Sequence, residues 1–169
     1  MLVFITSTLN TIFAQEASAA QILKVHLKPT IQITAMATPN VNIGFNTINQ
    51  YVHGSESGAQ EFKVHSNRDF VVNVRTSAPL FSYSGDAFPT PQMPVDDILF
   101  LSVGDNKTGG NIAGSYNSFS SLSNIPRDLL LNCNNGGDKS FTINYRANPG
   151  TNYPAGDYTV GVIYTATQP

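Results

Sequence analysis

The sequence predicts an all-β protein, an antiparallel immunoglobulin-like β-sandwich of about seven to nine strands in residues 20–169. Apolar and polar residues alternate in short runs that are separated by Gly, Pro, Asn and Ser, and no long stretch has helical periodicity. Charged residues make up 12% of the chain, about half the usual share of ~25%, and hydroxyl and amide side chains take their place. The 169 residues suffice for one domain with a hydrophobic core.

Residues 1–19 are predicted to be a secretory signal peptide. Leu2–Ala14 is an apolar run too short to span a bilayer, and Ala17-Ser18-Ala19 offers a cleavage site of small residues. Cleavage after Ala14 is the other choice, and a buried N-terminal strand is the alternative to a signal. No basic residue precedes Lys24, so we expect the true start to lie upstream. The expected location is the periplasm, the outer surface or the medium, with no membrane span in the mature chain.

The stretch "ILKVHLKPTIQITAM", residues 22–36, is the longest two-faced ribbon. Every odd position from Leu23 to Ala35 is apolar, and the positions between them are polar. Such a run would exceed ~40 Å, about twice the length of a usual strand, and Pro29 interrupts it because proline lacks a ladder donor.

Two interpretations of this ribbon stay open. In one, the strand crosses between sheets at Pro29 and both halves pack on their own domain. In the other, residues 30–36 belong to the home domain and residues 21–28 are donated to a neighbouring subunit as a missing strand. The side chains that would fill the neighbour are Leu23, Val25 and Leu27.

The remaining elements follow in order as strands and turns. Alternation predicts one strand face at Val41, Ile43 and Phe45, and a β-hairpin from residues 61–66 and 70–77 joined by residues 67–69. Prolines predict a loop over residues 79–95 with at most a short strand at 81–85. Further strands are expected at residues 98–101, 127–133, 140–148 and 157–169, with a long loop at 104–124 and a turn at 134–137.

The residues that could carry catalysis are few and scattered. His26, His53 and His65 fall in separate elements, and the chain has no nucleophile-elbow or H-E-x-x-H motif. We therefore expect no enzymatic activity, no catalytic or metal residues and no cofactor. The net charge of −2 argues against nucleic acid as a partner. Cys133 is the one cysteine and is expected to be a small, half-buried side chain beside a turn.

Exposed aromatic rings are the feature that would bind a sugar. The chain has no Trp, so Tyr51, Tyr116 and Tyr153, which fall in loops or at strand ends, are the candidate glycan contacts. The alternative is that each tyrosine buries its ring and leaves its hydroxyl in water.

The ending "YPAGDYTVGVIYTATQP" carries a family resemblance. Its Ala-Gly-x-Tyr step before an alternating strand resembles an uncharacterised family of bacterial secreted β-sandwich proteins and, more distantly, spore-coat-U subunits of archaic chaperone–usher pili. "VNIGFNTI" and "HSNRDFVVNVRTS" are similar to the start and the central hairpin of such domains. The pilin type usually has an early cysteine pair, whereas this chain has Cys133 alone. The resemblance implies a surface or filament role.

These observations predict a secreted, non-catalytic structural or adhesive subunit of a cell surface or fimbria. Its expected partners are copies of itself or other surface subunits, joined by strand addition. The alternative is a carbohydrate-binding β-sandwich module whose partners are glycans.

Overall fold

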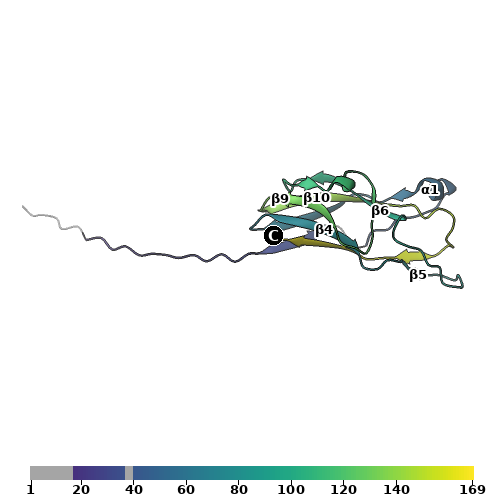
Figure 1. Ribbon diagram of the computed structural model, residues 1–169, viewed down its shortest axis with the longest axis horizontal. Coiled ribbons are helices and arrows are strands. Elements are labelled where there is room, and N and C mark those ends of the chain that lie inside the picture. The colour runs from purple at the N-terminus through teal and green to yellow at the C-terminus, as the bar shows by residue number, and fades with distance from the viewer. Residues whose placement is uncertain (1–16, 37–39) are drawn as a thin grey trace, which may run out of the picture.

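Two antiparallel β-sheets enclose one hydrophobic core in the computed structural model, which describes residues 17–36 and 40–169 (Figure 1). The six-stranded sheet has the order β1-β3-β10-β6-β8, with β2 also paired to β10. Its strands are β1 (Ile31–Ala35), β2 (Ser55–Glu56), β3 (Gln60–Ser66), β6 (Leu99–Asn106), β8 (Ser120–Ser121) and β10 (Gly136–Ala147). The predicted signal segment lies mostly outside the described residues.

The facing sheet has four strands in the order β12-β4-β9-β7. They are β4 (Phe70–Thr76), β7 (Asn111–Ile112), β9 (Arg127–Cys133) and β12 (Val162–Thr167). A separate two-stranded ribbon joins β5 (Ser82–Ser84) to β11 (Asp157–Thr159), and the two helical turns are α1 (Ile48–His53) and the 3-10 turn η1 (Gly114–Asn117). All strand pairings among the described residues are antiparallel, which confirms the all-β, antiparallel prediction.

The core forms because alternate side chains of each strand point to the same face. In β4, Phe70, Val72 and Val74 are at most 1% exposed, whereas the residues between them are half-buried. β6, β9 and β10 contribute the rest of the fully buried apolar layer, including Leu101, Leu129, Leu130, Phe141 and Ile143. Each such side chain contributes about 1.5–3 kcal/mol by leaving water, so the sandwiched layer holds the two sheets together.

The core is incompletely covered along one side of the molecule. There β1 ends one sheet and β12 ends the other, and the two strands lie near each other. Their inward apolar side chains, together with that of Val160 just before β12, pack against the core but stay only half-buried. We call these residues the seam: Ile31, Ile33, Val160, Val162, Tyr164 and Ala166. On the opposite side, the sheets end in two-residue strands, β7 and β8, which offer little edge for pairing.

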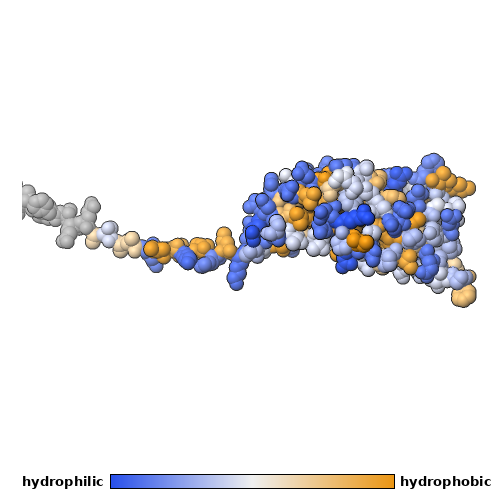
Figure 2. All heavy atoms as spheres, viewed as in Figure 1, coloured by the Kyte–Doolittle hydropathy of each residue, from blue (hydrophilic) through white to orange (hydrophobic). Residues whose placement is uncertain are grey.

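Residues 17–30 form no strand and extend away from the domain as a tail (Figure 1). The tail is exposed throughout, with Leu23 86%, Val25 72% and Leu27 86% exposed, and Figure 2 shows its apolar side chains standing clear of the domain. The interpretation in which both halves of the ribbon pack on their own domain is therefore wrong for this structure. Only residues 31–35 join the home sheet, through pairing with β3.

Two local predictions are also corrected. The strands β3 and β4 are joined by residues 67–69 as expected, but they belong to different sheets, so they do not form a hairpin. The expected strand face at Val41, Ile43 and Phe45 is absent, because those residues have no strand partner and lead into α1 instead. The short strand at 81–85 is confirmed as β5, which lies with α1 at the end of the molecule opposite the tail (Figure 1).

Candidate functional site

The root of the tail is fixed to the domain by Asn67, which lies in the β3–β4 connection. The Thr30 N–H donates to Asn67 Oδ1 at 2.9 Å, and Asn67 Nδ2 donates to the Lys28 carbonyl at 2.8 Å. Gln168, directly after β12, donates from Nε2 to the Thr30 carbonyl at 2.8 Å and to Ser66 Oγ at 2.8 Å. These bonds set where the tail leaves the body and hold the end of β12 beside that point.

The seam is lined by an aromatic cluster at its centre. The Tyr164 ring of β12 lies 4.5 Å from the Phe62 ring of β3, measured between centroids. Its hydroxyl is 2.6 Å from the Tyr145 hydroxyl of β10, so the pair bridges the two sheets. Burial, and then the neighbouring Tyr145, raise the pKa of Tyr164 well above its usual value, and burial also raises the pKa of Tyr145. Both phenols are therefore neutral at physiological pH, and their hydrogen bond links β10 to β12 beneath the seam.

The tail and the outer edge of β12 are complementary in pattern. Within the described residues, β12 is hydrogen-bonded to β4 on one side only, which leaves a row of backbone donors and acceptors unpaired. The tail presents Leu23, Val25 and Leu27 at every second position, the spacing with which β12 presents its inward side chains. The tail root sits at one end of this strand, so a single copy carries both an unpaired strand edge and an exposed segment with the same spacing of apolar residues.

The candidate glycan residues do not form one site. Tyr116 is 1% exposed in the turn η1 and belongs to the core, so its assignment as a glycan contact is wrong. The turn η1 packs against β6 and places the Tyr116 ring in the core. Burying the large apolar surface of the ring stabilises the fold. Tyr51 and Tyr153 are half-buried and line a common depression of about 410 Å³ with Asn148, Thr151 and Asn152.

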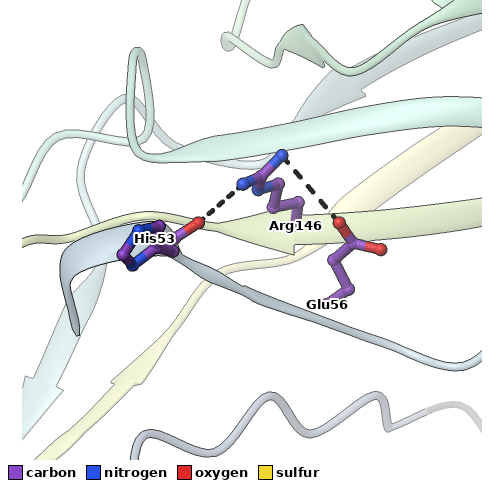
Figure 3. A network of polar contacts seen from close by, with 3 residues as sticks. All are labelled: His53, Glu56 and Arg146. Atoms are coloured by element: carbon purple, nitrogen blue, oxygen red, sulfur yellow. Dashed lines mark hydrogen bonds and ion pairs between the residues drawn. The ribbon is translucent and has the colours of Figure 1, made fainter. Parts of the chain in front are cut away.

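The helix α1 positions Tyr51 at this depression. Thr47 caps the helix, accepting from the Gln50 N–H at 3.4 Å, while the Gln50 side chain accepts from the Thr47 N–H at 3.1 Å. At the other end, Arg146 of β10 donates from Nη2 to the His53 carbonyl at 2.6 Å and approaches Glu56 at 3.9 Å (Figure 3). Both ends of the short helix are thus held, although its Ile48 and Val52 remain largely exposed.

The other singled-out residues stay apart. His26 lies in the tail, His53 at the end of α1 and His65 on the exposed face of β3. In the described ranges, no three His, Cys, Asp or Glu side chains gather where they could hold a metal ion. The Cys133 thiol is buried rather than half-buried, and its burial raises its pKa. No helix among residues 17–36 and 40–169 is long and apolar enough to cross a membrane.

Comparison with known proteins supplies no family for this chain. No model of a protein family matches it, and no curated protein sequence matches it.

Two features of the site escaped the sequence analysis. The pair Thr47 and Gln50 is a capping box and signals a helix start, but the alternation at residues 41–45 obscured it. The seam has no local signal at all, because the residues of an edge strand look like those of any strand until their neighbours are known.

Proposed function

We propose that this chain is a secreted, non-catalytic structural or adhesive subunit that assembles with copies of itself at a bacterial surface. Residues 21–28 of one copy would add as a strand to the outer edge of β12 in the next. The single observation that carries the proposal is the tail, whose three alternating apolar side chains are 72% or more exposed while the seam is half-covered.

The strand order supports this proposal. An immunoglobulin-like sandwich places strands in the order A-B-E-D on one sheet and has F between C and G on the other. The order β1-β3-β10-β6 follows A-B-E-D, and the neighbours β4 and β12 match C and F; β9 and β7 extend this sheet on the other side of β4. The position beside F, which G would occupy, holds no strand of the described residues. The proposed finer fold is therefore an immunoglobulin-like sandwich that needs one strand from a neighbour.

The energetic argument is the burial of apolar surface on both sides. Covering one Leu, Val or Ile side chain contributes about 1.5–3 kcal/mol, and main-chain hydrogen bonds along an edge add to this. Three tail side chains and the seam would leave water together. If the tail stayed in solvent, its alternation of apolar and polar residues would contribute no stability. Addition to a second copy would bury the apolar face, and this accounts for the alternation.

The experiment is to replace Val25 by Asp and measure the mass of the mature protein by light scattering across a concentration series. The wild-type chain is expected to form oligomers that grow with concentration. Val25→Asp is expected to be monomeric, because burying an unpaired carboxylate in the seam costs several kcal/mol. The matched control is His26→Asp, which places the same charge on the solvent face and is expected to assemble. A monomeric wild-type chain at high concentration would remove the proposal.

A second candidate function is carbohydrate binding at the depression that Tyr51 and Tyr153 share. Its volume of about 410 Å³ lies within the usual range of ~300–1,000 Å³ for ligand sites, and its lining combines two rings with amide side chains. A glycan-array signal lost in Tyr51→Ala and Tyr153→Ala, but kept in Phe88→Ala, would favour it. Phe88 is a suitable control because it is 96% exposed and does not line the depression.

A further inference from the structure

The depression beside α1 is surrounded by polar side chains that have no hydrogen-bond partner inside the chain. Within the described residues, the side chains of Asn148, Thr151 and Asn152 make no internal hydrogen bond, and neither do the hydroxyls of Tyr51 and Tyr153. All five residues line the same hollow, one from α1 and four from the connection that follows β10. Their donors and acceptors are therefore available to a ligand.

The neighbouring tyrosines of the β5–β11 ribbon differ in this respect. The Tyr83 hydroxyl donates to the Ala155 carbonyl at 2.9 Å, and the Tyr158 hydroxyl donates to the Pro154 carbonyl at 2.9 Å. These two phenols already have partners within the fold. A hollow where several uncommitted polar groups converge beside aromatic rings is the usual arrangement of a small-molecule site.

The walls of the depression are held in place by contacts within the chain. The Tyr51 ring lies 5.3 Å from the Phe45 ring, and the Tyr153 ring meets the Tyr158 ring edge-to-face at 6.4 Å, both measured between centroids. The Asn148 N–H donates at 2.9 Å to the carbonyl of the residue before β6, which fixes the start of the connection. A site held in this way needs little reordering on binding, which lowers the cost of holding a ligand.

Among the described residues, no charged side chain lines the depression, whose lining is aromatic, aliphatic, amide and hydroxyl. The nearest basic residue in the sequence, Arg146, donates to the His53 carbonyl at 2.6 Å and approaches Glu56 at 3.9 Å (Figure 3). Asp97 is exposed and directly precedes Ile98 of the lining. Proteins bind carboxylate, sulfate and phosphate groups through Arg and Lys, so this site disfavours acidic ligands.

We infer that the depression selects neutral hexopyranose units and rejects acidic sugars. One C–H face of the sugar packs on the rings of Tyr51 and Tyr153, and its hydroxyls bond to the amides of Asn148 and Asn152. A sugar hydroxyl both donates and accepts, and so does an amide through its NH2 and its carbonyl, so the two groups match. This inference rests on the second candidate function, carbohydrate binding, and adds the class of sugar and the role of each side chain.

A glycan array probed with the unaltered protein tests the class of sugar. The array carries neutral hexose oligosaccharides together with sialylated, uronic-acid and sulfated glycans. We expect binding to neutral glycans alone. Thr151→Arg would place a guanidinium at the depression, and this variant is expected to gain binding to sialylated and uronic-acid glycans.

Calorimetric titration with a neutral glycan that binds then tests the residues. Tyr51→Ala and Tyr153→Ala are each expected to weaken binding roughly tenfold, because each removes one stacking ring. Asn152→Leu is expected to weaken it by a similar factor through the lost hydrogen bonds. The matched control is Asn49→Leu, because Asn49 is exposed on α1 and does not line the depression. Circular dichroism checks that each variant is folded.

The remaining outcomes separate this inference from the function beneath it. Acidic glycans that bind as well as neutral ones would overturn the selection for neutral sugars and leave carbohydrate binding in place. Neutral binding that survives in both tyrosine variants would overturn the assigned residues. An array without any signal would overturn this inference together with carbohydrate binding, whereas assembly is judged separately by light scattering.

Discussion

At the scale of single residues, the hydroxyl pair of Tyr145 and Tyr164 is the most constrained contact of the seam. It links β10 to β12 at 2.6 Å across the two sheets. Losing one partner leaves the other hydroxyl unpaired, which costs about 1–3 kcal/mol for a buried group. The double change to phenylalanine removes both polar groups and keeps the shape, so it is the gentler variant for study.

The pair predicts a loss of stability at alkaline pH. The pKa of both phenols is raised in the folded chain, so they stay protonated there while the same phenols ionise in the unfolded chain above pH ~10. The unfolded state then binds fewer protons, and stability is complete below pH ~10 and falls as pH rises toward the folded pKa. Urea unfolding at several pH values should show a shallower fall in Tyr145→Phe/Tyr164→Phe. Equal slopes in both proteins would contradict the prediction.

At the scale of elements, the tail and the outer edge of β12 have matching patterns of apolar residues, but within one copy they do not pair with each other. The tail leaves at the root held by Asn67 and points away from the body (Figure 1). The seam side chains of the same copy therefore stay half-buried. In the proposed assembly, a strand from another molecule covers them.

A peptide can supply that strand. A peptide of residues 21–30 is expected to bind the Val25→Asp protein, whose seam is intact but whose own tail is disabled. Ligand at 100 times its Kd stabilises a protein by ~2.7 kcal/mol, so the melting temperature should rise with peptide concentration. The same peptide carrying Val25→Asp is the control and should leave the melting temperature unchanged. An equal rise in melting temperature with both peptides would show that binding does not depend on the apolar side chains of the peptide.

At the scale of the whole molecule, donor and acceptor surfaces differ, so the proposed contact is heterologous. Such contacts generate open filaments when the rotation between copies does not close a ring.

Two defective variants should therefore complement each other. Val25→Asp can accept a strand but not donate one, and Ala166→Arg can donate but not accept, because the larger, charged side chain would block the seam. Each alone is expected to be monomeric and the mixture to form 1:1 dimers in analytical ultracentrifugation. Circular dichroism of each variant controls for folding. Long polymers in the mixture, or dimers of either variant alone, would contradict the heterologous arrangement.

The sequence by itself determined that the chain is built of antiparallel strands and that residues 23–29 form a two-faced segment. Both are properties of alternation, which is local and reads directly from neighbouring residues. The prolines of residues 79–95 predicted a loop with at most a short strand at 81–85, and β5 is that strand. The capping box at Thr47 was readable too, although the alternation before it led to the wrong element.

Only the tertiary structure decided which strands became edges, and with them the candidate site. Strand pairing joins residues far apart in the chain, so nothing near Val162 or Ile31 indicates that their sides of the sheets are left open. The same long-range packing buried Tyr116 while bringing Tyr51 and Tyr153 to one depression. Whether a side chain is buried depends on which other segments of the chain pack against it. Those segments are distant in the sequence, so local patterns do not predict the burial.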